Sequence, residues 1–201
     1  MTKIQQHAAH TSVAAVAPSE AEGAVAAIVL AFASDPAARW SYPDPQDYLA
    51  HFPAVVRAFG GRAFAAGTAD RVDRFAGAAL WLPPGIGPDE DTLAAILQET
   101  VAPERRAEVS AVLERMGSYH PSEPHWYLPL IGVDPVHQHR GHGSALLRHA
   151  LRRCDDQHAP AYLESSNPPN IPLYERHGFV IMDTIQEGSS PPNVPMLRTA
   201  R

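Results

Sequence analysis

A loop rich in glycine and histidine, residues 134–144, contains the residues whose types and spacing point most clearly to chemistry. Gly141 and Gly143 have no Cβ, so a ligand can approach the backbone closely where N–H groups converge at the positive end of a following helix. The segment between Asp134 and Asp155 contains four arginines and no acidic residue, although the whole chain has a formal net charge of −6 at pH 7. These features predict a local site for an anion such as pyrophosphate.

Two common phosphate-binding loops do not explain this segment. It lacks the Gly-Lys-Ser or Gly-Lys-Thr ending of a Walker loop, and it lacks the Gly-x-Gly-x-x-Gly spacing of a dinucleotide-binding turn. The pattern that remains is Gln-x-x-Gly-x-Gly at residues 138–143, after an apolar stretch. His137, His139 and His142 could share a zinc ion, but no cysteine or nearby carboxylate supplies further ligands, so we expect no metal.

Hydrophobic periodicity predicts the elements that position this loop. Strands are expected over residues 13–16, 62–67, 74–82, 126–133, 161–165, 179–184 and 194–198. One helix is expected from a Ser19–Glu22 capping box to residue 34, and a second helix is expected to end before Gly60. Further helices are expected over residues 91–100 and 104–116, after Gly143, and over residues 172–177. Residues 118–125, rich in proline and histidine, are expected to form a loop at the edge of a substrate site.

Composition limits the class of protein. With 201 residues, 45% of them apolar, the chain is expected to form one domain over residues 1–201, with residues 1–12 as a loose tail. The acidic net charge disfavours a nucleic-acid partner, and no apolar run reaches the roughly 20 residues that span a membrane. The single cysteine, Cys154, cannot form an internal disulfide, which favours a cytoplasmic location. It is expected to be a buried structural thiol.

Two segments together resemble a known superfamily. Residues 138–143 resemble the acetyl-CoA pyrophosphate loop of the GNAT acyltransferases, and residues 170–179, Asn-Ile-Pro-Leu-Tyr-Glu-Arg-His-Gly-Phe, resemble their second hallmark. Residues 31–39, 120–124, 133–138 and 163–166 are similar to stretches of the puromycin N-acetyltransferases. The resemblance implies an α/β fold, with a mixed, twisted central sheet flanked by helices.

The activity that the resemblance implies is acetyl transfer from acetyl-CoA to a small-molecule amine by direct attack in a ternary complex. An aminonucleoside antibiotic such as puromycin is one such amine, which would make the protein an antibiotic-resistance enzyme. A peptide or protein amino group is an alternative acceptor, and a non-catalytic acyl-CoA sensor is an alternative function. The protein would be a monomer or a homodimer.

The resemblance also implies roles for individual residues. Tyr174 would be the general acid that protonates the departing thiolate, because a phenol is protonated at neutral pH. Glu164 would be the base that deprotonates the acceptor, directly or through water, with His120 and His125 behind it. The N–H of Val133 would stabilise charge on the thioester oxygen.

The resemblance implies two sets of binding residues. Acetyl-CoA would contact Ile131, Gly132, Val133, Gln138, His139, Arg140, Gly141, His142, Gly143, Ser144, Asn170 and Tyr174. The acceptor would contact Trp126 and His125.

Overall fold

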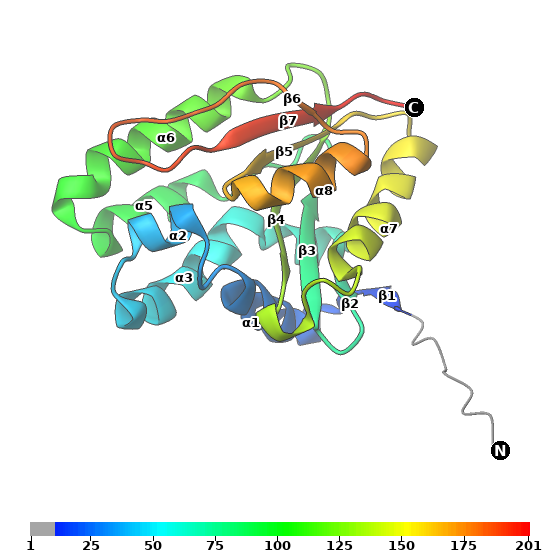
Figure 1. Ribbon diagram of the computed structural model, residues 1–201, viewed down its shortest axis with the longest axis horizontal. Coiled ribbons are helices and arrows are strands. Elements are labelled where there is room, and N and C mark those ends of the chain that lie inside the picture. Colours follow the sequence, from blue (N-terminus) through cyan, green and yellow to red (C-terminus); the bar gives the residue numbers. More distant parts are fainter. Residues whose placement is uncertain (1–10) are drawn as a thin grey trace.

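A seven-stranded mixed sheet forms the centre of the computed structural model, which describes residues 11–201 (Figure 1). The strand order is β1-β2-β3-β4-β5-β7-β6, and every neighbouring pair is antiparallel except β4 and β5. The strands are β1 (Val13–Ala15), β2 (Ala69–Val72), β3 (Gly77–Leu82), β4 (Trp126–Val133), β5 (Ala161–Ser165), β6 (Val180–Ile181) and β7 (Val194–Arg198). The predicted mixed α/β fold is therefore confirmed, while the tail predicted for residues 1–12 lies almost wholly outside the described residues.

Helices cover both faces of this sheet, and the sheet separates two apolar cores. They are α1 (Ala21–Ala31), α2 (Pro36–Ser41), α3 (Pro45–Gly60), α4 (Arg62–Ala66), α5 (Glu90–Thr100), α6 (Arg106–Tyr119), α7 (His142–Asp156) and α8 (Ile171–Arg176). Side chains of α1, α3 and α6 share one core with Leu80 and Leu130, and those of α7 and α8 share the other with Trp81 and Leu163. No helix within residues 11–201 is both long enough and apolar enough to cross a membrane.

The strand predicted over residues 62–67 is wrong, because this segment is helix α4. Its sequence, Arg-Ala-Phe-Ala-Ala, contains no β-branched residue, and alanine favours a helix. Gly67 ends the helix in the left-handed conformation, at φ 68°. Strand β2 then begins at Ala69, where the sequence had predicted only a turn.

The capping box predicted for Ser19 and Glu22 is also wrong. Pro18 begins a short 3-10 turn one residue earlier, and the Glu20 carboxylate accepts the N–H of Ala17 at 3.2 Å. Glu22 instead forms an ion pair with Arg57 of α3. The helix itself is present as α1, and the Glu20 side chain caps the 3-10 turn that precedes it.

Strands β4 and β5 diverge because β4 contains a bulge. Leu80 faces Leu130 and Leu82 faces Tyr127, so Trp81 alone on β3 faces two residues of β4, one of them Pro129. Proline has no N–H to donate to a neighbouring strand. The register between β4 and β5 covers only the first two residues of each strand, and beyond it the sheet opens.

Candidate active site

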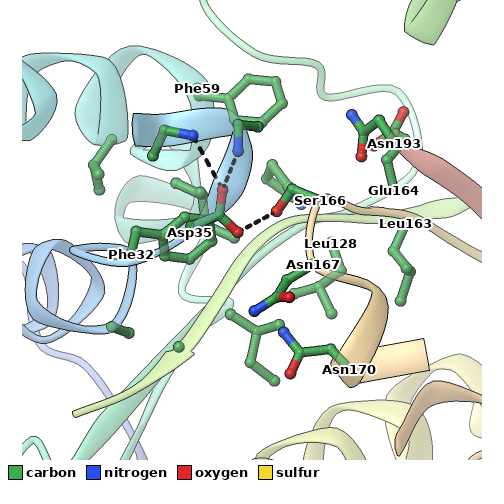
Figure 2. A pocket seen from close by; sticks show the side chains of 18 of the residues that line it. Phe32, Asp35, Phe59, Leu128, Leu163, Glu164, Ser166, Asn167, Asn170 and Asn193 are labelled. Atoms are coloured by element: carbon green, nitrogen blue, oxygen red, sulfur yellow. Dashed lines mark hydrogen bonds between the residues drawn. The ribbon is translucent and has the colours of Figure 1, made fainter. Parts of the chain in front are cut away.

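A cavity of about 680 Å³ lies at this opening in the sheet (Figure 2). One end is lined by the glycine loop and the second half of β4, and the middle by the end of β5 and by α8. The other end is lined by apolar side chains of α3, α5 and α6. The cavity therefore connects the predicted anion site with an apolar chamber.

The glycine loop forms a backbone cradle at the start of α7. Gly141 adopts φ 84°, a left-handed conformation that strains any residue with a Cβ. The first bond of the helix runs from the Ala145 N–H to the Gly141 carbonyl, so the N–H groups of residues 142–144 have no helical partner. These donors, at the positive end of a helix, fit a diphosphate.

The polar side chains of this loop stabilise it from several directions. The Gln138 amide donates to the Val133 carbonyl at 3.2 Å, which ties the loop to the end of β4. Ser144 pairs with His177 Nε2 at 2.7 Å. His139 lines the cavity, whereas the Arg140 side chain does not. Within residues 11–201, no group of three or more His, Cys, Asp or Glu side chains is placed to hold a metal ion.

The second half of β4 presents backbone donors to the opening. The Asp134 N–H donates to Ala76, which precedes β3, at 2.9 Å. Because amide directions alternate along a strand, the N–H groups of Val133 and Ile131 point away from β3 and into the opening. Gly132 lies against α1, where a Cβ would come within 2.4 Å of Ala31. Glycine at this position lets α1 approach the sheet closely.

Tyr174 lines the cavity from α8 and is 6% exposed. Its ring meets Phe179 edge-on, with the ring centroids 6.2 Å apart. Burial, and to a smaller extent the charge of Asp35, raises the pKa of this phenol above its usual value, so its proton is retained at neutral pH. Asn170, immediately before α8, also lines the cavity.

Glu164 lies in the middle of the cavity with a 2% exposed side chain. One oxygen accepts the Tyr127 hydroxyl at 2.9 Å, and the other, Oε1, is 3.4 Å from His120 Nε2. Burial first and the Glu164 charge second raise the pKa of Tyr127, so its hydroxyl remains a donor. Within residues 11–201, Glu164 Oε1 is buried without a hydrogen bond.

Asn193 supplies a second buried oxygen beside Glu164, and the sequence had given no reason to select it. Glu164 faces Pro195 across β5 and β7, so Asn193, two residues earlier, lies on the same side of the sheet (Figure 2). Its amide nitrogen donates to Met116 Sδ, while in the described part of the chain its Oδ1 is buried and unbonded. Two unsatisfied acceptors in one chamber favour a ligand that brings N–H donors.

Asp35 is a further cavity residue that the sequence had not marked as functional. Its carboxylate caps α2 by accepting the N–H groups of Ala37 and Ala38, and it accepts the Ser166 hydroxyl at 2.6 Å (Figure 2). Burial raises the pKa of Asp35 despite these bonds. The contact joins the start of α2 to the end of β5, and Asp35 followed by Pro36 is itself a helix-start pattern.

Trp126 does not lie at the acceptor end, contrary to the expectation. Its side chain is 3% exposed, packs in the core beneath α7, and donates to Gln157 at 3.0 Å. Side chains alternate along a strand, and Trp126 lies on the face opposite Tyr127. His125 lines a second cavity of about 1080 Å³, bounded by α5 and α6, instead of the first.

Cys154 lies on the buried face of α7 and is 0% exposed, which confirms the predicted buried thiol. Burial raises the pKa of its thiol to about 12. The group is therefore an uncharged, inert part of the core at neutral pH.

Two sequence comparisons both relate this chain to N-acetyltransferases. The profile of the Acetyltransferase (GNAT) family matches residues 35–179. An uncharacterized N-acetyltransferase of Schizosaccharomyces pombe is 40% identical over 60 residues, which is 30% of this chain and 24% of the relative. The chain thus spans about a quarter of the length of that relative.

Solved structures of acetyltransferases share the fold. One from Corynebacterium glutamicum, described as histone acetyltransferase HPA2 and related acetyltransferase, has a TM-score of 0.71 and 26% identity over 95% of this chain and 97% of its own. Arylalkylamine N-acetyltransferase 2 of Aedes aegypti has a TM-score of 0.66 and 9% identity over 96% and 100%. The polyamine N-acetyltransferase of Drosophila melanogaster, which forms N-acetylagmatine, has a TM-score of 0.60 and 13% identity over 94% and 99%.

Proposed function

Because this chain belongs to the acetyltransferase (GNAT) family of acetyl-CoA-dependent N-acetyltransferases, we propose that it acetylates the amine of a small molecule with an apolar body. The observation that carries this proposal is a single cavity, which joins a backbone cradle that fits a diphosphate to an apolar chamber containing a buried carboxylate. Residues 1–201 would act as one domain in the cytoplasm.

The cofactor would bind along the first half of this cavity. The N–H groups of residues 142–144 would hold the diphosphate, and Asn170 would contact the pantetheine arm. The arm would pair with the exposed backbone of β4, where the Val133 N–H is placed to stabilise charge on the thioester oxygen. Gln138 would support this geometry through its bond to the Val133 carbonyl.

Two side chains would move protons during the transfer. Glu164 takes a proton from the acceptor ammonium group, which frees the nitrogen lone pair to attack the thioester carbonyl carbon. The new C–N bond forms and the C–S bond breaks, and the Tyr174 hydroxyl donates its proton to the sulfur. The nitrogen of the new amide then loses its second proton, which returns to the Tyr174 phenolate directly or through water. Burial raises the pKa of this phenol above that of a thiol, so the donation to sulfur depends on the breaking of the C–S bond and on the return of the nitrogen proton to Tyr174.

The chamber indicates the class of acceptor. Glu164 and Asn193 offer unpaired oxygens to an amine, and Asp35 adds a second carboxylate nearby. The remaining walls are largely apolar or aromatic and include Phe32, Trp40, Phe52, Val56, Phe59, Leu97, Leu113 and Met116. Such a chamber suits an amine attached to an aromatic or alkyl group, and puromycin is a specific candidate of this kind. An enzyme that acetylates puromycin would confer resistance to it.

The test is release of coenzyme A, followed with a thiol reagent across a panel of puromycin, 2-phenylethylamine, agmatine and a lysine-containing peptide. We expect acetyl-CoA consumption with the aromatic amines and slower release with agmatine, whose short alkyl chain ends in a charged guanidinium group. Turnover with the peptide alone would favour a protein acceptor. Binding of acetyl-CoA with no release for any amine would contradict the proposal and favour a sensor.

A further inference from the structure

A row of polar contacts extends from Glu164 through two histidines into the loop after α6; the histidines are joined to each other and to the loop by hydrogen bonds, whereas Glu164 Oε1 and His120 Nε2 are in contact without one. His125 Nδ1 lies 2.8 Å from the Glu123 carbonyl oxygen, and His125 Nε2 lies 3.1 Å from His120 Nδ1. The other nitrogen of His120, Nε2, faces Glu164 Oε1 at 3.4 Å. Both nitrogens of each ring therefore contact a polar atom of a neighbouring residue.

The directions of these bonds fix where the protons lie. A carbonyl oxygen can only accept, so His125 Nδ1 carries a proton, and the Nε2 of its neutral ring is an acceptor. His120 Nδ1 must then be the donor to His125, which leaves Nε2 of a neutral His120 without a proton. That bare nitrogen would face a carboxylate oxygen, which is also an acceptor. The contact is attractive only when one proton lies between Nε2 and Oε1.

The pair lies between two cavities. Glu164 is 2% exposed and lines the first cavity, whereas His120 is 27% exposed and lines the second together with His125. Tyr127 and Tyr162 hold the His120 ring from two strands, each with its ring centroid 4.5 Å away. Glu164, His125 and the hydroxyls of Tyr127, Tyr162 and, more distantly, Tyr119 are the titratable groups around His120.

We propose that Glu164 and His120 share one proton and act as a relay from the acceptor chamber to the second cavity, with His125 fixing the tautomer of His120. This inference rests on the proposed acetyl transfer. Glu164 passes its proton to His120 Nε2, and the resulting imidazolium loses this Nε2 proton to water that enters from the second cavity, while the Nδ1 proton stays on the bond to His125. Glu164 is then an anion again and accepts the proton of the acceptor ammonium. His120 and His125 are positioning residues, because they act through Glu164.

The first test reads the tautomers directly and needs no acceptor. Long-range ¹H–¹⁵N correlation spectra of protein labelled at histidine distinguish protonated from bare ring nitrogens, and H120Q and H125Q assign the two signals by their absence. We expect a proton on Nδ1 of both rings and a bare Nε2 on His125. A proton on His125 Nε2, or a bare His120 Nδ1, would overturn the proposal.

The second test measures kcat with the fastest acceptor of the amine panel. We expect H120A to lower kcat about tenfold or more, with the KM for acetyl-CoA unchanged, and added imidazole to restore part of the rate from the open second cavity. H125F, which cannot accept the His120 proton, should lower kcat, whereas H125Q should retain most of it. The control is H158N, because His158 lies after α7 and lines neither cavity.

The outcomes of these tests distinguish a failure of the proton relay from a failure of the proposed acetyl transfer. Wild-type kcat in H120A, or a loss that imidazole does not restore, would overturn the relay. If H120A does not fold, the comparison of H125F with H125Q replaces it as the test. Equal kcat values in these two variants would then overturn the relay. Absence of turnover in the wild-type protein would contradict the proposed function instead, and the tautomers would still show whether the proton arrangement exists.

Discussion

Tyr174 has two properties that a general acid requires: it lies on the cavity wall beside the opening of β4 and β5, and burial keeps its phenol protonated. We predict that Y174F lowers kcat roughly 10²-fold, because the sulfur then leaves without a proton donor, while the affinity for acetyl-CoA changes little. Initial rates and calorimetric titration measure the two quantities.

The control for Y174F is another buried tyrosine outside the cavity. Tyr48 is 2% exposed and donates its hydroxyl to the Val29 carbonyl at 2.6 Å. Y48F should lose on the order of 1 kcal/mol of stability with the lost hydrogen bond, and should retain its kcat. Equal rates for Y174F and the wild-type protein would remove Tyr174 from the mechanism.

Asp35 gives a prediction about stability and pH. Burial raises the pKa of its carboxyl, so the folded protein binds this proton more tightly than the unfolded chain, and the free energy of unfolding falls as the pH rises above about 4. D35N retains a side-chain oxygen to cap α2 and loses the buried charge. We predict that D35N gains stability relative to wild type as the pH rises toward 7. Denaturant unfolding at several pH values measures this, and a difference that does not vary with pH would contradict it.

We predict that the glycine loop and helix α7 act together as an element that binds an anion. G141A places a Cβ at φ 84°, which costs roughly 1–2 kcal/mol of backbone strain and should turn the N–H groups of residues 142–144 away from their present directions. We predict at least a tenfold weaker affinity for acetyl-CoA. G67A is the matched control, with φ 68° and open space around its Cβ, and it should lose similar stability but keep its affinity. Equal affinities in the two variants would show that the loop does not bind the cofactor.

Local sequence patterns predicted the elements that carry the chemistry better than those that surround them. The strand at residues 126–133 is a strongly apolar run, and the helix with Cys154 on its inner face has a strong helical periodicity; both are confirmed. The segment 62–67 is short and apolar, and such a segment fits a strand or a helix turn equally well, so only its packing decides. Pro129 within a central strand could have signalled the bulge, because proline is rare there unless pairing is interrupted.

The acceptor end of the site could not be predicted from the sequence, because it is assembled from distant segments. Asp35 meets Ser166, Glu164 meets Tyr127 and His120, and Asn193 comes from the loop before β7. Each of these contacts depends on strand register and on the face to which a side chain points. A shift of one residue reverses that face, so Trp126 lies in the core beneath α7 while its neighbour Tyr127 lies on the side of Glu164.

At the scale of the whole molecule, cofactor binding should stabilise the fold, because the cavity joins both halves of the sheet. Coenzyme A at about 100 times its Kd should add about 2.7 kcal/mol, which corresponds to a rise in Tm of roughly 5–10 °C for a chain of this size. Pantetheine at the same concentration lacks the diphosphate and should give a much smaller rise. Differential scanning calorimetry measures both, and equal shifts would contradict binding through the glycine loop.

The most direct test is a crystal structure of the protein with coenzyme A. We predict that the diphosphate accepts the N–H groups of residues 142–144, and that the thiol lies in the opening between β4 and β5 within hydrogen-bond reach of the Tyr174 hydroxyl. A diphosphate bound elsewhere, or a thiol far from Tyr174 and Val133, would contradict the account.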